Sequence, residues 1–123
     1  PARYPLTVLS SILGDSSGSK MYWDLVDTGI AESASADSDE RDGVGSFGAY
    51  ASTDPARLDE VVDRMRKILA QPMNFSDGEL ERAKAKLMSR IVLDGELPMG
   101  RLMSMGLEYA YRRELTPLEA VIN

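Results

Sequence analysis

Residues 12–32, ILGDSSGSKMYWDLVDTGIAE, decide how the chain folds, because four segments follow one another here in a fixed order. The apolar end of a helix predicted over residues 5–13 leads into a small polar turn. This turn offers several side chains that can cap a short amphipathic helix over residues 21–27, and Gly29 is a typical residue to follow a helix. The chain then leaves as a strand, predicted over residues 30–36.

The composition constrains function mainly through two residue types that are absent. The 123 residues include no cysteine and no histidine. The chain therefore cannot build a Ser-His-Asp triad, a Cys-His pair, a thiolate site or any zinc site that uses histidine. The net charge of −6 argues against a surface for nucleic acid or anionic membrane. No apolar run approaches the roughly 20 residues of a membrane span.

A second strand is predicted over residues 44–53, where the sequence VGSFGAYAST alternates between two faces. One face would hold Phe47, Ala49 and Ala51, and the other Val44 and Tyr50. The polar residues 37–43 are predicted to form the turn of an antiparallel hairpin. Their acidic members could bind a hard cation, but they lack the spacing of a calcium loop, which favours a solvated turn. These members are Asp37, Asp39, Glu40 and Asp42.

Two helix starts downstream carry capping signals. Asp54 and Pro55 suit the N-cap and the first position of a helix that Pro72 ends. Ser76 and Glu79 form a capping box for the next helix. The first of these helices is amphipathic, with charged residues opposite its apolar stripe, and the charged face of the second is predicted to be solvated. Its apolar stripe is Leu58, Val61, Val62, Met65, Ile68 and Leu69.

The C-terminal part of the chain is predicted to hold one more helix, over residues 101–113, after a break at residues 95–100. Thr116 and Glu119 match a second capping box, yet only residues 118–123 remain for the helix that it would open. A well-marked start with almost no helix behind it predicts that the chain is part of something longer.

Three pieces of the chain match a family pattern in their order and spacing, and together they cover nearly the whole sequence. They are LSSILGDSSGSKMYWDLVDTGIAESASA (9–36), GSFGAYASTDPARLDEVVDRM (45–65) and SDGELERAKAKLMSRIVLDGELPMGRLMSMG (76–106). The family forms Leu-Gly-Gly-Gly, Ser-Arg-Leu-aromatic and Gly-Leu-Ala appear here in altered form, as Leu-Gly-Asp-Ser at residues 13–16, Ser-Lys-Met-Tyr at 19–22 and Gly-Ile-Ala at 29–31. The chain resembles the second half of one unit of the pitrilysin-type zinc metallopeptidases, a superfamily that includes insulinases, mitochondrial processing peptidases and bacterial zinc proteases.

The resemblance implies an α+β fold, in which an antiparallel β-hairpin belonging to a larger sheet packs against several helices. Residues 1–123 would then form a single partial domain, the C-terminal half of one unit. Two such units, in one chain or two, enclose a chamber in this superfamily. One unit carries zinc on a His-x-x-Glu-His motif with a distal Glu. Its partner often supplies an Arg and a Tyr, six residues apart, that hold the substrate peptide.

The chain departs from the family at both of these functional places. The zinc motif is missing, and the Arg and Tyr positions fall on Val26 and Glu32. A valine cannot donate a hydrogen bond to a peptide carbonyl, and a carboxylate repels one. We therefore expect no catalytic residue, metal ligand or cofactor in this chain, with zinc in a partner or in another part of the parent protein. Two interpretations stay open: the second half of a zinc-bearing unit, or a non-catalytic unit, which we favour.

The expected function is that of a non-catalytic domain of a zinc metalloprotease, which completes the peptide-binding chamber and docks with a zinc-bearing unit. The alternative is a scaffold subunit of the same superfamily with no role in proteolysis. The expected partners are a zinc-bearing homologous unit and a peptide substrate, and an exposed sheet edge could also pair two copies of the chain. The expected compartment is the cytoplasm or periplasm of a bacterium.

Two further hypotheses compete with the resemblance. An unrelated α+β domain would mimic the family through ordinary helix patterning, and it would be favoured if the two predicted strands did not pair. An independent enzyme would need a pair of carboxylates for acid–base chemistry, for which Asp24, Asp27 and Glu32 are the available cluster. Their spacing matches no metal site, and this hypothesis is the least favoured.

Overall fold

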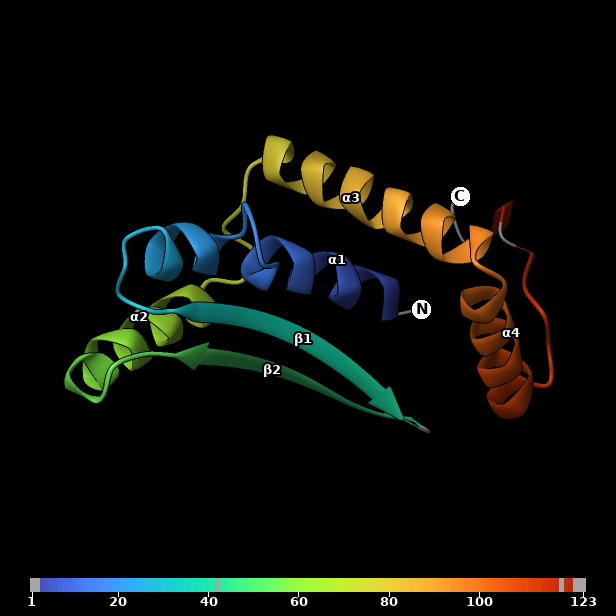
Figure 1. The fold of residues 1–123 in the computed structure, drawn as a ribbon, viewed down its shortest axis with the longest axis horizontal. Helices are drawn as coiled ribbons and strands as arrows, with labels where there is room; N and C mark the ends of the chain where they lie inside the picture. Colours follow the sequence, from blue (N-terminus) through green and yellow to red (C-terminus); the bar gives the residue numbers. More distant parts are fainter. Residues whose placement is uncertain (1–2, 42, 118, 121–123) are drawn as a thin grey trace. The chain divides into compact units, whose positions relative to one another are not determined.

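The computed structural model describes residues 3–41, 43–117 and 119–120. The described part is α+β, as predicted, with one antiparallel hairpin and several helices (Figure 1). By their contacts the residues divide into two compact units, 1–83 and 84–123. The elements are α1 (Arg3–Gly14), the π-helix η1 (Tyr22–Val26), β1 (Ser33–Arg41), β2 (Val44–Ser52), the 3₁₀-helix η2 (Pro55–Arg57), α2 (Leu58–Ala70), α3 (Asp77–Glu96) and α4 (Pro98–Arg112).

The hairpin of the first unit pairs β1 with β2 in one unbroken register, from Ser33 opposite Ser52 to Arg41 opposite Val44. The pairing confirms the predicted hairpin, but the predicted turn at residues 37–43 is wrong. The strand continues to Arg41, and its charged residues lie exposed within the ladder rather than in a loop. A reversal this tight needs a residue with positive φ, which Gly43 supplies at +82°.

The two faces of β2 differ in burial as the alternation predicted. The side chains of Phe47, Ala49 and Ala51 pack against the hydrophobic core. Val44 and Tyr50 are 74% and 63% exposed on the opposite face. The hairpin is therefore covered on one face only in the described residues, because helices of the first unit pack on that face.

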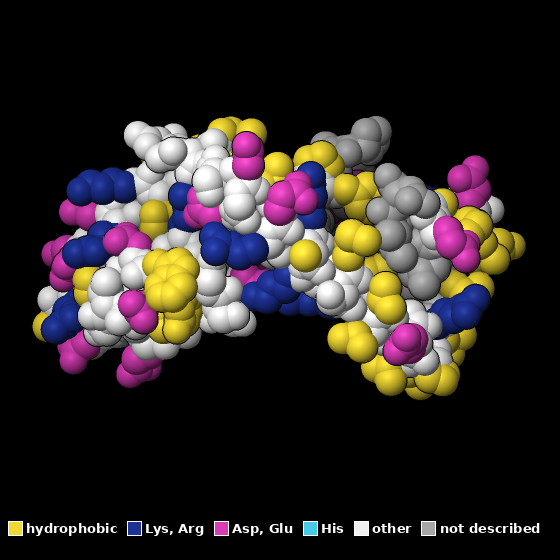
Figure 2. Space-filling view, turned by 90° about the horizontal axis from the view of Figure 1, so that it is seen from above, with side chains coloured by type: hydrophobic (Ala, Val, Ile, Leu, Met, Phe, Trp, Pro, Cys, Tyr) yellow, Lys and Arg dark blue, Asp and Glu magenta, His cyan; other side chains and the backbone are white. Residues whose placement is uncertain are grey.

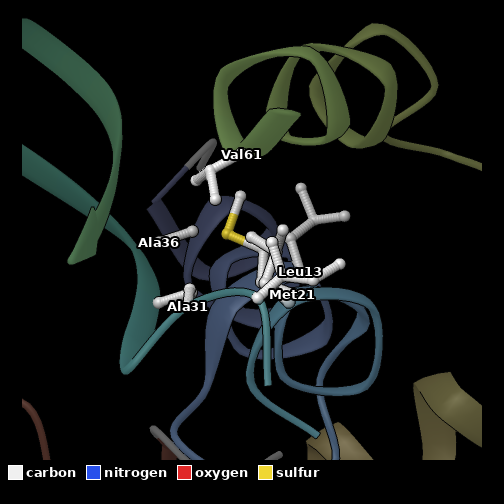
Figure 3. Packing of buried hydrophobic residues seen from close by; sticks show 8 residues of the cluster. Leu13, Met21, Ala31, Ala36 and Val61 are labelled. Carbon is white, nitrogen blue, oxygen red and sulfur yellow. The ribbon is translucent and has the colours of Figure 1, made fainter. Parts of the chain in front are cut away.

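The core of the first unit lies where α1, η1, the hairpin and α2 meet (Figure 3). Leu13, Met21 and Leu25 are completely buried, and Figure 3 shows Val61 reaching from α2 toward the same cluster. The buried members of this cluster are Leu13, Met21, Leu25, Ile30, Ala31, Ala34, Ala36 and Val61. Five of these eight come from residues 12–32, so the stretch around the Gly/Ser turn supplies much of the core.

The helix α2 follows the capping signals of the sequence. The Asp54 side chain accepts a hydrogen bond from the Ala56 N–H at 2.9 Å, and Pro55 takes the first position of η2. Of the predicted apolar stripe, Val61 is buried and Val62, Met65 and Ile68 are partly buried. Leu58, at the start of the stripe, is 54% exposed.

The second unit consists of the later turns of α3, the helix α4 and the residues that follow them. The predicted break within residues 95–100 is confirmed but is shorter than expected, because α3 runs to Glu96 and α4 begins at Pro98. Only Leu97 is extended between them, with φ −82° and ψ 122°, a conformation that a following proline favours. Many apolar side chains of α4 are exposed, and Figure 2 shows apolar side chains gathered in that part of the molecule.

The second predicted capping box lies partly beyond what is described, since residues 118 and 121–123 fall outside it. Thr116 bonds to Glu108 of α4: its N–H donates to Oε2 at 3.0 Å, and its hydroxyl donates to Oε1. Among the described residues, no helix is both long and apolar enough to cross a bilayer.

Candidate functional site

The Gly/Ser turn before η1 is built as a helix cap. The Ser19 hydroxyl is buried, donates to the Asp15 carbonyl at 2.7 Å and accepts the Tyr22 N–H at 3.1 Å. Gly29 follows with φ +76°, the left-handed conformation expected after a helix. These contacts confirm the capping interpretation of the turn, because Ser19 uses its hydroxyl within the protein.

The short helix after this turn is a π-helix, which the sequence pattern did not foresee. The Asp27 N–H reaches the Tyr22 carbonyl at 2.8 Å, and the Ile30 N–H reaches the Leu25 carbonyl at 3.0 Å. Both bonds span five residues, and the Ala31 N–H joins the same Leu25 carbonyl at 2.9 Å. Such single π turns are frequent at functional sites, since the extra residue re-aims the side chains that follow.

The two family positions lie in different surroundings: Val26 is the last residue of η1, and Glu32 directly precedes β1. Val26 is partly buried and packs against the hydrophobic core. Glu32 is exposed; its N–H donates to the Ser52 carbonyl at 2.8 Å, and the Ser52 hydroxyl reaches its carboxylate at 3.5 Å. The structure therefore does not bring the two positions to one exposed surface: Glu32 is accessible to a peptide, and Val26 contributes to packing.

Side chains of α2, η2 and the residue after β2 bind the backbone around these two positions. Arg64 Nη1 lies 3.0 Å from Asp24 Oδ1 and 3.4 Å from the Asp24 carbonyl oxygen. Its Nη2 donates to Glu60 at 3.2 Å. Arg57 donates to the Gly29 carbonyl at 3.4 Å. The Thr53 hydroxyl donates to the carbonyl of Ile30 at 2.7 Å.

Sequence reasoning missed this set of contacts, since it placed Arg64 only on the charged face of the helix, opposite the apolar stripe. One signal was available: Arg57 and Arg64 are seven residues apart, about two helical turns, which puts both on one side of a helix. Which backbone they would meet depends on the tertiary fold, because Asp24 and Arg64 are 40 residues apart in the chain.

A further polar contact joins the start of α3 to Lys20, which follows the Ser19 cap. Glu79 accepts the Ser76 N–H at 2.8 Å and the Ser76 hydroxyl at 3.2 Å, which confirms the predicted capping box. Lys20 Nζ lies 3.4 Å from the other carboxylate oxygen of Glu79. The Ser76 N–H, and then the charge of Lys20, hold the pKa of Glu79 below its ordinary value.

The carboxylates that an independent enzyme would need are not arranged as one group. Asp24 is paired with Arg64, Asp27 is exposed after the π turn, and Glu32 lies beside Ser52. Within the described residues, no three carboxylates lie close enough to hold a metal ion. The chain has neither His nor Cys, so its donor set does not fit zinc, and no chemical step can be assigned to zinc on these residues.

The comparison with protein families places these elements in one known domain. A family model described as the Peptidase M16 inactive domain matches residues 1–87. The match includes the helix cap, both strands, α2 and the capping box of α3, and it covers more than half of the chain. The chain therefore belongs to the pitrilysin-type M16 peptidases, as a non-catalytic domain of that family. A search of curated proteins found no match.

Proposed function

We propose that this chain completes the peptide-binding chamber of a zinc metallopeptidase by docking with a zinc-bearing unit of the same family. The observation that carries the proposal is the match to the M16 inactive domain over residues 1–87, a range that includes both Val26 and Glu32. An inactive domain contributes surface rather than chemistry, which agrees with a chain that has no His or Cys. The parent protein would then be a zinc endopeptidase, with its zinc held outside this chain.

The contribution to substrate binding would centre on Glu32. Its carboxylate is exposed, and its own N–H and the Ser52 hydroxyl fix its place at the start of the hairpin. A peptide carbonyl would be repelled there, whereas a Lys or Arg side chain or an N-terminal amine would be attracted. The chamber wall would therefore favour basic peptides over acidic ones near Glu32.

The hairpin offers a surface for docking at its edges. Each strand of a two-stranded sheet has one edge whose backbone N–H and C=O groups are not paired within the sheet. The strand β2 carries no charged residue and no proline, which are the usual means of protecting an edge. We propose that a further strand of the same unit, or of the zinc-bearing unit, pairs there. A second copy of this chain is the alternative occupant.

The scaffold alternative has one observation in its favour. Val26 packs against the core and its side chain has no hydrogen-bond donor, and the carboxylate of Glu32 only accepts, so neither family position offers a donor to a peptide. A domain that has lost both donors can still dock with its partner and hold it in place. The two functions differ in whether cleavage changes when the chain is present.

The experiment uses a zinc-bearing M16 unit, with an intact His-x-x-Glu-His motif, encoded in the same or a neighbouring gene. Size-exclusion chromatography would test whether the two associate, and hydrolysis of a quenched fluorescent peptide would be measured with and without this chain. Association with increased cleavage supports the proposal, and association without any change supports the scaffold. No association contradicts both. Cell fractionation would test the expected bacterial cytoplasm or periplasm.

A further inference from the structure

Three successive contacts join residues 53–64 to the backbone of residues 24–30. The side chains of Thr53, Arg57 and Arg64 donate hydrogen bonds to the carbonyl oxygens of Ile30, Gly29 and Asp24, respectively. We call these three donors the latch. Thr53 directly follows β2, Arg57 ends η2 and Arg64 lies in α2. Their targets lie in η1 and in the segment that links η1 to β1.

The carbonyls at the end of a helical turn need such donors. The last carbonyl groups of a helix have no partner within it, and side chains or water must satisfy them. At the end of η1 the Leu25 carbonyl is bonded by the Ile30 and Ala31 N–H groups. The Asp24 carbonyl accepts the Thr28 hydroxyl at 2.8 Å and Arg64 at 3.4 Å. The Gly29 carbonyl, beyond the end of η1, accepts Arg57, so side chains of η2 and α2 help to hold this segment.

Arg64 makes two contacts with Asp24, whereas Thr53 and Arg57 each make one contact with their partners. One guanidinium nitrogen contacts both the carboxylate and the carbonyl of Asp24, and the other binds Glu60 on the same helix. The contact with Glu60 orients the planar guanidinium of Arg64, because it holds Nη2 on α2 while Nη1 points toward Asp24 in η1. Arg64 therefore joins η1 to α2. A lysine at this position would keep the charge but not the two-sided geometry of the guanidinium.

We propose that Arg64 is a positioning residue, and that the latch fixes residues 24–32 so that Glu32 is presented at one place on the chamber wall. This inference rests on the proposed function for the role of Glu32, but the latch is a property of the chain alone. Peptide docking near Glu32 would then respond to changes in α2, although no residue of α2 need touch the peptide.

The ionic part of the latch responds to salt. The side chains of Arg64 and Asp24 are 34% and 40% exposed, so dissolved ions screen their attraction. The Thr53 contact involves no ion and is not screened. Raising the ionic strength should therefore loosen the segment at its Asp24 end, while the Thr53 bond to the Ile30 carbonyl persists.

The test is amide hydrogen exchange of the whole chain, comparing residues 24–32 with the β1–β2 ladder. Arg64→Gln should speed exchange of the Ile30 and Ala31 amides by about two- to fivefold at low salt. The ladder amides should keep their rates, and Arg64→Lys should fall between the wild type and Arg64→Gln. In 1 M NaCl the wild type and Arg64→Gln should converge, because the ion pair is screened.

The matched control is Arg66→Gln, which removes an equal charge from an exposed position of α2. It should leave the exchange of residues 24–32 unchanged. Equal acceleration of ladder and segment amides by Arg64→Gln would overturn the proposal, since Arg64 would then support only the global fold. A wild-type segment that exchanges at the same rate at low and high salt would overturn it as well.

A second readout separates the latch from the proposed function. Anisotropy of a dye-labelled Lys-rich decapeptide would be measured on the complex with the zinc-bearing unit. Weaker peptide binding by Arg64→Gln, with faster exchange, supports the whole inference. Faster exchange without any peptide binding by the wild type would leave the latch standing and contradict the role of Glu32.

Discussion

Gly14, the last residue of α1, lies directly against the backbone of Ala36 in β1. A methyl group added to Gly14 would fall 2.0 Å from the amide nitrogen of Ala36 and 2.4 Å from its Cβ. Backbone atoms of a paired strand cannot move aside as a flexible side chain does. The close approach of α1 to the hairpin therefore requires glycine at this position.

The substitution Gly14→Ala is expected to destabilise the first unit by about 3 kcal/mol, at the upper end of the effects of overpacking. The reason is that either α1 or β1 must shift, which opens the core around Leu13. Urea unfolding followed by circular dichroism would measure the change. The control is Gly48→Ala in β2, where an added methyl meets nothing within 4 Å. Equal losses for the two variants would contradict this account.

Acid sensitivity is expected from Glu79, whose pKa lies below its ordinary value. A carboxyl with a lowered pKa in the folded state stabilises the fold above its unfolded pKa, which is about 4.3. That contribution is lost as the pH falls through the lowered folded value. Glu79→Gln should therefore cost about 0.5 kcal/mol or less at pH 7, because glutamine can keep the capping contact and solvent screens the lost charge, and the difference from wild type should shrink below about pH 4.

The measurement for Glu79 is the free energy of unfolding as a function of pH for both proteins. Asp63→Asn, at an exposed position of α2, is the control and should leave the wild-type profile nearly unchanged. A constant gap between wild type and Glu79→Gln from pH 7 down to pH 3 would show that the carboxylate charge is not what stabilises the cap.

The sequence predicted the features that depend on neighbouring residues alone. The caps at Asp54 and Ser76 and the alternation of β2 were all confirmed, because each depends on residues within three or four positions. The extent of β1 was missed because its second half is polar. Its place in the ladder depends on pairing with β2, and not on its own composition.

The surroundings of the candidate site residues were harder to predict from the sequence. The resemblance supplied the two positions, Val26 and Glu32, and nothing in their spacing indicated that one would pack in the core and the other remain exposed. The π turn adds one residue to a helix, and its register is fixed by the Ile30 and Ala31 amides that return to the Leu25 carbonyl.

Replacing a leucine by alanine should lower the free energy of unfolding much more at a buried position than at an exposed one. Leu25→Ala removes a completely buried side chain from η1 and is expected to cost about 2–5 kcal/mol, since a cavity remains in a packed cluster. Leu58→Ala, in the predicted apolar stripe but 54% exposed, should cost less than about 1 kcal/mol. Urea denaturation of both variants would compare them, and equal costs would contradict the packing around η1.

The proposed function makes a prediction for the charge of the peptide. Glu32 is exposed at the start of the hairpin, beside Ser52, and its carboxylate would attract basic and repel acidic residues of a bound peptide. Glu32→Gln keeps the size of the side chain and removes the charge. In the complex with the zinc-bearing unit, it should weaken binding of a Lys-rich decapeptide and strengthen binding of a Glu-rich one. Each change should be about two- to fivefold at low salt.

Fluorescence anisotropy with the two dye-labelled peptides measures this preference directly. Asp27→Asn is the matched control, because it removes an equal charge from an exposed position before Gly29 and should shift neither affinity by as much. Salt should reduce the preference of the wild type and leave that of Glu32→Gln nearly flat, since only the former depends on the carboxylate. If Glu32→Gln and wild type bind both peptides alike, the peptide lies elsewhere, and the scaffold function gains the advantage.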